Sequence, residues 1–417
     1  MPVIKSVRGL EILDSRGRPT IKAYIEFRNG ITASASVPSG ASTGKSEAHE
    51  LRDGEARFGG LGCLKAVTHI NKTINPSLSG KQLDNQHDLD DYLVQLDGTS
   101  NKSNLGANAI LAVSLAFARA QAMNLDQSLF QYFSRLDDLP VQFMPRPTIN
   151  LFSGGKHAGG QIAIQDLLIV PLQSKMSEAL QCAYAVYQSA AALCLEKYQM
   201  RALTADEGGL APPFKDIGEL FESAMQAIEN AGYQPGASVK LALDIASSHF
   251  FSNDQYSINN TTLNGDQMID LLWKWASKYP ITSIEDGLAE DDWKHWPKLL
   301  TTIGSKSLVL GDDLLCTNPD RIERAIREKS ANALLLKVNQ IGTISEALKA
   351  LKIARKAGWS VTVSARSGET EDDWLADLAV GWQADYIKIG SITQSERLAK
   401  YNRLLEIEQE LQLKIKN

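Results

Sequence analysis

Six apolar runs decide the fold, and each ends on charged or hydroxyl residues: Val239-Lys-Leu-Ala-Leu-Asp244, Ile281-Thr-Ser-Ile-Glu285-Asp286, Ser307-Leu-Val-Leu-Gly-Asp312-Asp313, Ala333-Leu-Leu-Leu-Lys337, Ser360-Val-Thr-Val-Ser-Ala-Arg366-Ser367 and Tyr386-Ile-Lys388. A buried parallel strand is a continuous apolar run, and a helix must cross back to the next strand. Strand, helix and two loops together need roughly 25–40 residues, and the runs recur at about this interval. The pattern therefore predicts repeated β/α units.

Successive β/α units of this kind curl into a barrel. The carboxyl ends of the barrel strands converge on one face, and that face carries the chemistry. We therefore predict an α/β fold built on a (β/α) barrel, in which the residues that end the six runs surround a single pocket.

The chain of 417 residues has room for a barrel and one smaller domain. Residues 140–147 contain three prolines and mark the expected boundary, with an α+β domain at 1–138 and the barrel domain at 139–417. Residues 18–37 alternate apolar and polar side chains around Asn29-Gly30, which predicts a β-hairpin. Helices are predicted at 105–123, 176–198, 217–230, 320–329, 344–356 and 372–382.

The composition is ordinary for a soluble globular protein, with 43% hydrophobic and 22% charged residues. A net charge of −6 offers no basic footprint, so neither nucleic acid nor an anionic membrane is expected as a partner. The start, Met1-Pro-Val-Ile-Lys5, lacks the apolar core of a signal peptide, and the longest apolar stretch, 107–118, is too short to span a bilayer. The four cysteines form no CxxC pair and are expected to be reduced. We expect a cytoplasmic protein.

A loop of small residues, Pro38-Ser-Gly-Ala-Ser-Thr-Gly-Lys-Ser46, follows the predicted hairpin. Its tail nearly matches a phosphate-cradling P-loop, but it has one residue too few between the glycines, and no buried parallel strand leads into it. These two differences disfavour a nucleotide-binding loop. The segment is instead expected to be a mobile lid that can bring Ser39 over a ligand.

Three acids, Asp244, Glu285 and Asp312, come from successive strand ends. Converging carboxylates repel one another and tend to hold their protons unless a cation offsets the charge. Oxygen ligands with little histidine or cysteine nearby favour Mg²⁺ over zinc. The sequence therefore predicts a magnesium site, and the alternative is that each acid caps a helix or pairs with a nearby lysine.

Basic residues end the remaining runs. Lys337 would lie beside the metal cluster, where nearby cations lower the pKa of its amine and allow it to act as a general base. Its alternative role is a structural ion pair with one of the acids. Arg366 and Ser367 suit an oxyanion such as phosphate, and Lys388 suits a carboxylate.

Two glycine-rich segments hold further candidates, and each taken alone is more typical of a solvated turn. They are Gly154-Gly-Lys-His157-Ala-Gly-Gly160 and Thr204-Ala-Asp206-Glu207-Gly-Gly209. A metal, a lysine base and an acid on the opposite side together describe one reaction. Such a site removes the α-proton of a carboxylate and then expels a β-substituent.

Seven long strings in the chain look like the signatures of one family. They are Glu11-Ile-Leu-Asp-Ser-Arg-Gly-Arg-Pro-Thr20, Pro38-Ser-Gly-Ala-Ser-Thr-Gly44, Gly106-Ala-Asn-Ala-Ile-Leu-Ala-Val-Ser114, Ser283-Ile-Glu-Asp-Gly287, Leu336-Lys-Val-Asn-Gln-Ile-Gly342, Arg366-Ser-Gly-Glu-Thr-Glu-Asp372 and Ser395-Glu-Arg-Leu-Ala-Lys400. The chain thereby resembles the enolases, the phosphopyruvate hydratases, over nearly its whole length. The resemblance implies an enolase-type (β/α)8 barrel with an N-terminal α+β capping domain, usually assembled as a homodimer.

The resemblance also implies an activity, the dehydration of 2-phosphoglycerate to phosphoenolpyruvate with two Mg²⁺ ions. The residues that match the family's functional positions are Asp244, Glu285 and Asp312 for the first Mg²⁺, Ser39 for the second Mg²⁺ and the phosphate that it bridges, Lys337 for removal of the C2 proton, Glu207 for departure of the C3 hydroxyl, Arg366 and Ser367 for the phosphate, Lys388 for the carboxylate side, and His157 for the loop histidine.

Two positions depart from the enolase pattern on the side where the hydroxyl leaves. Ala365 stands where the family has histidine, and Asp166 stands where it has glutamate. Aspartate reaches about one C–C bond, ~1.5 Å, less far than glutamate. The retained base and metal ligands predict proton abstraction, whereas the dehydration step is the one affected.

Three functions are compatible with this pattern. The first is an enolase that tolerates both changes. The second is a specialised relative of the carboxyphosphonoenolpyruvate synthase type, from phosphonate natural-product biosynthesis, that accepts another β-group or a phosphonate. The third is a non-catalytic binding protein on the enolase scaffold, and the complete metal and base set argues against it.

Overall fold

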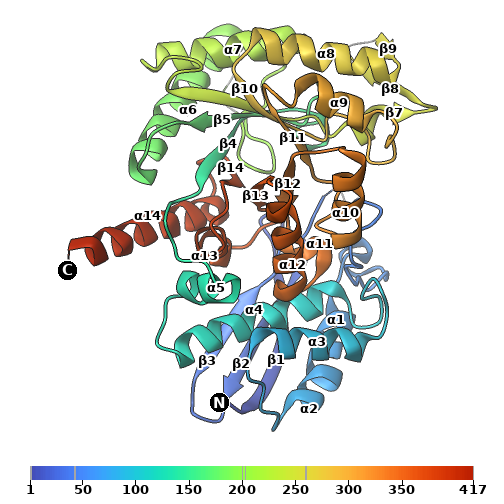
Figure 1. Cartoon of the computed structure of the whole chain (residues 1–417), viewed down its shortest axis with the longest axis vertical. Helices are drawn as coiled ribbons and strands as arrows, with labels where there is room; N and C mark the ends of the chain where they lie inside the picture. Colours follow the sequence, from blue (N-terminus) through green and yellow to red (C-terminus); the bar gives the residue numbers. More distant parts are fainter. Residues whose placement is uncertain (1, 42–43, 200, 202, 259–260, 417) are drawn as a thin grey trace.

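The fold consists of a closed eight-stranded barrel and a smaller α+β domain that covers one end of it (Figure 1). The computed structural model describes residues 2–41, 44–199, 201, 203–258 and 261–416, with side chains as far as residue 412. In Figure 1 the barrel occupies the upper part and the small domain, blue to teal, the lower part. The predicted α/β barrel with an N-terminal cap is confirmed.

The barrel strands include all six predicted runs. In order around the barrel they are β10 (Ile281–Glu285), β11 (Leu308–Gly311), β12 (Ala333–Leu336), β13 (Ser360–Ser364), β14 (Tyr386–Gly390), β4 (Arg146–Ser153), β5 (Asp166–Pro171) and β6 (Val239–Asp244). β5 is antiparallel to both of its neighbours, β4 and β6, so the barrel begins irregularly.

Sequence analysis did not predict β4 and β5 as strands. Pro147, which served as a boundary signal, is the second residue of β4. In β5 the acid Asp166 begins the apolar run instead of ending it, because the strand runs in the opposite direction. Asp166 nevertheless pairs in register with Asp244, the last residue of β6, so both carboxylates reach the same end of the barrel.

Alternation along the strands decides which side chains enter the barrel. Leu241 and Leu243 of β6 belong to the large apolar core shared with the helices, whereas Ala242 packs in a separate small cluster with Leu168 and Val170 of β5. These small clusters are the packed layers of the barrel interior. Asp244 shares the inner face with Ala242, which places its carboxylate at the mouth.

Helices surround the barrel, and most lie where they were predicted. They are α6 (Met176–Tyr198), α7 (Ile217–Asn230), α8 (Gly265–Lys278), α9 (Trp296–Ile303), α10 (Pro319–Glu328), α11 (Val338–Ile341), α12 (Ile344–Lys356), α13 (Trp374–Gly381) and α14 (Ser395–Lys416), with short turns η3 (Gly155–His157) and η4 (Ser247–Phe250). A small sheet of β7 (Phe251–Ser252), β8 (Gln255–Ile258) and β9 (Thr261–Leu263) precedes α8. The predictions at 176–198, 217–230 and 344–356 are confirmed at both ends.

The helix predicted from residue 372 begins later, at Trp374. The carboxylate of Asp372 accepts the backbone N–H of Ser36 at 2.7 Å and pairs with Arg119 at 2.6 Å. Asp372 therefore connects the barrel to the cap and stands outside the helix.

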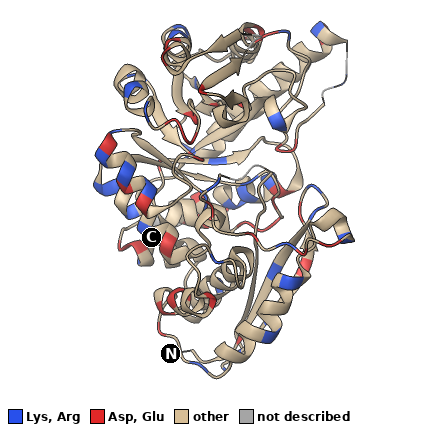
Figure 2. Cartoon of the chain, turned by 90° about the vertical axis from the view of Figure 1, so that its right-hand side faces the viewer, with Lys and Arg blue, Asp and Glu red and all other residues tan. Residues whose placement is uncertain are grey.

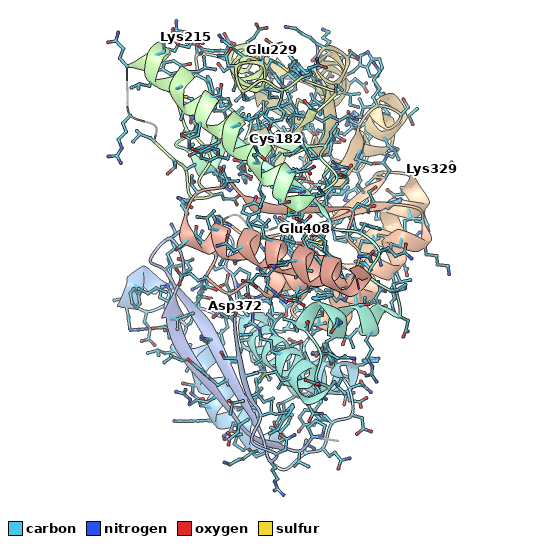
Figure 3. The ribbon with its side chains drawn as sticks, turned by 90° about the vertical axis from the view of Figure 1, so that its left-hand side faces the viewer. Cys182, Lys215, Glu229, Lys329, Asp372 and Glu408 are labelled. Carbon is cyan, nitrogen blue, oxygen red and sulfur yellow. The ribbon has the colours of Figure 1, made fainter. Side chains whose placement is uncertain are left out.

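α14 packs against α13, β14 and α6 on the outside of the barrel. Figure 3 shows Glu408 of this helix near the lower end of α6, which carries Cys182. The Glu408 carboxylate accepts the N–H of Met176 at 2.5 Å, so it caps the first turn of α6. Figure 2 shows basic and acidic residues interspersed along the helices around the barrel.

The cap combines an antiparallel sheet with a layer of helices. The sheet contains β1 (Ile4–Leu13), β2 (Pro19–Phe27) and β3 (Thr32–Ser36), and the helical layer contains η1 (Arg57–Gly60), α1 (Leu64–His69), η2 (Ile70–Ile74), α2 (Asn75–Leu78), α3 (Gln86–Asp97), α4 (Ala107–Asn124) and α5 (Leu129–Asp137). The predicted hairpin of β2 and β3 is confirmed, with Gly30 at φ +89° in its turn. β1 was not predicted.

α4, predicted at 105–123, is apolar on nearly every side because it packs between two layers. It contacts β2 and β3 on one side and α11 and α12 of the barrel domain on the other. Among the described residues, no helix has both the length and the apolar character needed to cross a membrane. All four cysteines are buried with free thiols, as predicted.

The cap faces the carboxyl ends of the barrel strands. The N–H of Ser39 donates to the carbonyl of Gly368 at 2.8 Å, and the N–H of Ala48 donates to the carbonyl of Gln340 at 2.7 Å. Through Ser39 the segment predicted as a lid touches the loop after β13, and Ala48, just beyond that segment, touches α11. Residues 42 and 43 of the segment lie outside the described residues. The domain boundary at 138/139 stays a prediction.

Candidate active site

The three predicted metal ligands lie at the mouth of the barrel. Asp244 ends β6, Glu285 ends β10, and Asp312 directly follows β11; all three are buried. Glu285 and Asp244 are register partners in the parallel ladder. The convergence that the apolar runs indicated is therefore present.

Two lysines offset the charge of these carboxylates. Lys388 Nζ of β14 lies 2.8 Å from Asp244 Oδ2 and 2.7 Å from Glu285 Oε2. Lys337, which follows β12, forms an ion pair with Asp312. The lysine pairing that was the alternative to a metal site is thus realised, and the same residues form one buried network.

The pKa values show which charges dominate this network. Burial alone would lower the pKa of the Lys337 amine, but attraction to Asp312 outweighs it and the pKa is raised. The lowered pKa predicted for Lys337 depends on bound metal cations and stays a prediction. Among the side chains alone, the acids outweigh Arg366 and Lys388 and keep this pKa high. Burial, with repulsion from Asp244, raises the pKa of Glu285 well above its ordinary value.

The donor set fits a hard divalent cation. Glu285 Oε1 and Gln165 Oε1 are buried oxygens without a hydrogen-bond partner among the described residues, so both leave lone pairs unused. The amide nitrogen of Gln165 donates to Asp244 at 3.2 Å, which directs this glutamine to the same cluster. Carboxylate and amide oxygens are the ligands that Mg²⁺ prefers.

A group of three acidic side chains that could hold a metal ion lies beside these ligands. One ligand atom each of Asp286, Asp312 and Asp313 lies within 4.8 Å of the others. Asp286 accepts the N–H groups of Asp312 at 3.0 Å and Asp313 at 2.8 Å, so it shapes the loop that carries Asp312. Among the described residues, Asp312 is the only one of the three predicted metal ligands in this group. Asp244 and Glu285 instead form ion pairs with Lys388.

A second group lies on the opposite side of the mouth. Ligand atoms of His157, Asp166 and Glu207 all lie within 4.8 Å of one another. His157 Nδ1 is 2.9 Å from Asp166 Oδ2, and the Ser153 hydroxyl donates to Asp166 Oδ1 at 2.5 Å. The Asn150 amide donates to Glu207 Oε2 at 3.1 Å. The two glycine-rich segments therefore bring His157 and Glu207 together beside Asp166, while Lys156 and Asp206 of the same segments stay exposed.

Glycine is required next to Glu207. Gly208 has φ +84°, and a Cβ there would lie 2.6 Å from the Thr393 hydroxyl. The turn that results buries Glu207, while Asp206 stays exposed.

Charges in this second group stabilise a protonated histidine. Burial alone would lower the pKa of His157, but attraction to Asp166 and Glu207 raises it to about 9. The pKa of Glu207 is lowered despite its burial, chiefly because of His157 and Arg397. Burial raises the pKa of Asp166. At neutral pH the site therefore holds a histidine cation beside the Glu207 carboxylate.

Ala365 directly follows the last residue of β13 and precedes Arg366. It is buried, and its N–H donates to the carbonyl of Lys388 at 2.8 Å. The side chain at this buried position is therefore only a methyl group. That Ala365 and Asp166 depart from a family pattern stays a prediction.

Arg366 and Ser367 each have partners in the cap. The terminal nitrogens of Arg366 lie 3.0 and 3.2 Å from the two carboxylate oxygens of Glu47. The Ser367 hydroxyl accepts the N–H of Ala41 at 2.9 Å and a guanidinium N–H of Arg16 at 3.2 Å. Sequence analysis missed Glu47 and Arg16 as site residues; both stand in or beside the quoted family-like strings, which was the available signal.

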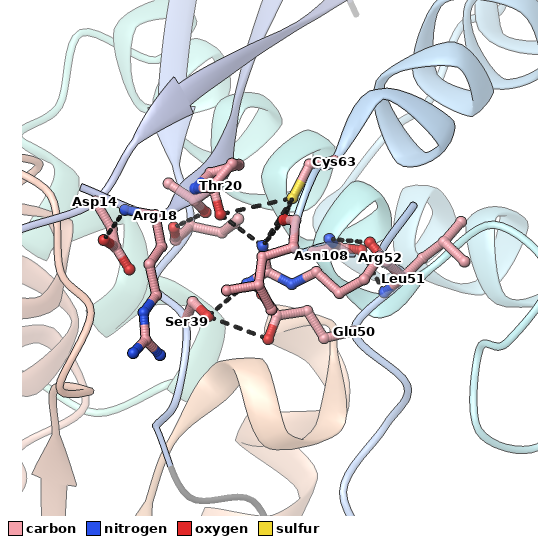
Figure 4. Close-up of polar contacts among 12 residues, drawn as sticks. Asp14, Arg18, Thr20, Ser39, Glu50, Leu51, Arg52, Cys63 and Asn108 are labelled. Atoms are coloured by element: carbon pink, nitrogen blue, oxygen red, sulfur yellow. Dashed lines mark hydrogen bonds and ion pairs between the residues drawn. The ribbon is translucent and has the colours of Figure 1, made fainter. Parts of the chain in front are cut away.

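Ser39 is buried next to this pair, but its side chain has other partners. Figure 4 shows its hydroxyl between Glu50 and Arg52. The hydroxyl accepts from Arg52 at 2.7 Å and donates to Glu50 at 3.2 Å. The structure therefore brings the Ser39 backbone to Gly368, and directs its hydroxyl into the cap.

Comparison with protein families gives two matches. A family model described as "Enolase, N-terminal domain" matches residues 4–133. A second, described as "Enolase, C-terminal TIM barrel domain", matches residues 141–416. Together the two matches cover nearly the whole chain.

We predict that Asp166→Asn lowers the pKa of His157 substantially, because the carboxylate that stabilises its cation is lost. A histidine with a folded pKa of about 9, against an ordinary 6.5, stabilises the fold fully below about pH 6.5 and loses that contribution as pH rises through 9. Histidine NMR across pH 5–10 measures the shift. Asp270→Asn, at an exposed position, is the control, and an unchanged His157 titration in Asp166→Asn would refute the assignment.

Proposed function

The chain belongs to the enolase family, and from this premise we propose that it is a Mg²⁺-dependent lyase that dehydrates 2-phosphoglycerate to phosphoenolpyruvate. The observation that carries this proposal is the buried network at the barrel mouth, in which three carboxylates and two lysines converge from separate strands. A site of this kind suits a small substrate with several negative charges.

Asp244, Glu285 and Asp312 would hold the first Mg²⁺. Ser39 would contribute to a second only after its hydroxyl leaves Glu50 and Arg52 of the cap. Bound Mg²⁺ would neutralise these carboxylates, weaken the attraction that raises the pKa of Lys337, and stabilise negative charge on the substrate carboxylate. The unused buried oxygen of Glu285 supports this assignment.

Lys337 would take the proton from C2. Its side chain is only 12% exposed, and the ion pair with Asp312 holds its amine at the mouth. On the other side, Glu207 and His157 would assist departure of the C3 hydroxyl as water, with Asp166 holding the imidazole. Arg366 and Ser367 would bind the phosphate, and Lys388 would lie on the carboxylate side.

The remaining expectations concern the oligomeric state, the cellular location and the pathway of the protein. We propose a homodimer, supported by exposed Leu10 and Leu13 on β1, which are 42% and 56% accessible. A cytoplasmic location and a role in glycolysis follow from the same activity and are part of the proposal.

Ala365 and Asp166 favour one alternative substrate. A site that forms the enolate but lacks the usual histidine and glutamate could expel a different β-group, as in an enzyme of carboxyphosphonoenolpyruvate synthase type. Phosphonate analogues of 2-phosphoglycerate therefore belong in the substrate panel. The non-catalytic alternative is disfavoured, because a binding scaffold has no use for the base Lys337.

The direct test uses protein, Mg²⁺ and 2-phosphoglycerate in D₂O, with phosphoenolpyruvate followed by absorbance and C2 deuteration by NMR. We expect both signals, and we expect Lys337→Ala to reduce them by roughly 10²–10⁴-fold, the usual contribution of a general base. Deuteration without product would favour the alternative substrate. Persistent exchange in Lys337→Ala would refute its role as base.

We further predict that Ala365→His combined with Asp166→Glu raises the rate of phosphoenolpyruvate formation at least about tenfold, because general acid–base groups contribute this much or more. Ala365→Leu is the control for added bulk without an acid. A double variant no faster than the wild type would show that these positions do not limit dehydration.

A further inference from the structure

Glu47 forms an ion pair with Arg366, the residue that the proposed function assigns to phosphate binding. Its two carboxylate oxygens lie 3.0 and 3.2 Å from the two terminal nitrogens of Arg366. The side chains are 7% and 3% exposed, so this ion pair is shielded from water and weakly screened by salt. Two parallel contacts of this kind form the fork that arginine uses for carboxylate and for phosphate.

The same carboxylate holds a turn of the cap. Glu47 Oε1 accepts the N–H of Gly44 at 3.0 Å, and the N–H of Glu47 donates to the carbonyl of Gly44 at 3.1 Å. The Gly44–Glu47 turn is therefore fastened to Arg366 through one side chain.

Gln340 links the Glu47–Arg366 ion pair to Asp312, one of the predicted metal ligands. Its amide nitrogen lies 3.4 Å from Glu47 Oε1 and 2.8 Å from Asp312 Oδ1. Its amide oxygen accepts from the Thr317 hydroxyl at 2.7 Å, which fixes the orientation of the amide. Glu47 thus belongs to the same hydrogen-bonded network as a predicted metal ligand.

We propose that Glu47 is a built-in competitor of the substrate oxyanion at Arg366, and that oxyanion binding releases the Gly44–Glu47 turn. The inference rests on the proposed function only in assigning an oxyanion to Arg366. The two terminal nitrogens that would face the oxyanion already contact Glu47, so a ligand that takes the fork must displace that carboxylate.

Competition of this kind selects among ligands by charge. Replacing Glu47 by another monoanionic carboxylate exchanges one equivalent ion pair for another. A phosphoryl or phosphonyl dianion brings a second negative charge to a pocket that also contains Lys337 and Lys388. The contact therefore favours dianions over simple carboxylates at Arg366.

The experiment uses inorganic phosphate, which binds without turnover, and the variants Glu47→Gln and Glu50→Gln. Glu50 is a matched control because it is a half-buried carboxylate of the same segment that pairs with Arg52 and contacts Ser39 (Figure 4). Calorimetry gives the Kd for phosphate. Trypsin cleavage after Lys45, whose side chain is 72% exposed, reports release of the turn.

We expect phosphate to speed cleavage after Lys45 in the wild type, and Glu47→Gln to be cleaved quickly without phosphate. The phosphate Kd of Glu47→Gln should fall about tenfold if Glu47 leaves Arg366 in about one wild-type molecule in ten. Glu50→Gln should behave as the wild type in both assays. Unchanged or weaker phosphate binding by Glu47→Gln would overturn the proposal. A rate of wild-type cleavage after Lys45 that does not change with phosphate would overturn it as well.

Two further measurements keep the test decisive. If Glu47→Gln does not fold, Glu47→Asp, which reaches ~1.5 Å less far, should shift the phosphate Kd in the same direction. Phosphoenolpyruvate formation is measured in parallel. Tightened phosphate binding without turnover would contradict the proposed function alone, and turnover with unchanged phosphate binding would contradict the competition alone.

Discussion

The interaction on which the rest of the site depends is the pairing of Lys388 with Asp244 and Glu285. Buried carboxylates at neighbouring strand ends repel one another and would otherwise retain their protons. One lysine amine, 2.8 and 2.7 Å from the two acids, holds them in place from the opposite strand of the barrel. Lys337 has the same relation to Asp312. Because the Lys388 pairs are buried, removal of one member leaves an uncompensated charge and is strongly destabilising.

The N-terminal cap contributes contacts to the site residues at the barrel mouth. Glu47 contacts Arg366, and Arg16 contacts Ser367, so both predicted phosphate-binding residues have partners from the N-terminal domain. The Ser39 backbone pairs with Gly368 at the same place. A single apolar core runs through cap and barrel, and it fixes these contacts relative to the strand ends. The arrangement of the site therefore depends on both the cap and the barrel.

Sequence reasoning predicted what depends on periodicity and missed what depends on direction and long-range packing. Six barrel strands were found because each of their apolar runs ends at the barrel mouth, and α12 was found because Thr343 caps it. β5 was missed because its acid, Asp166, begins the run. The raised pKa of Lys337 and the partnership of Glu47 with Arg366 depend on which side chains meet in space, and spacing along the chain carries no such information.

The central claim is that the buried acids at the mouth form a divalent metal site whose charge the two lysines otherwise offset. Titration with Mn²⁺, followed by the loss of its free EPR signal and by competition with Mg²⁺, tests it directly. The account predicts saturable Mn²⁺ binding that Mg²⁺ displaces, and that is lost in Glu285→Gln, the residue with the unused buried oxygen. Absence of bound Mn²⁺, or equal binding by Glu285→Gln, would contradict it.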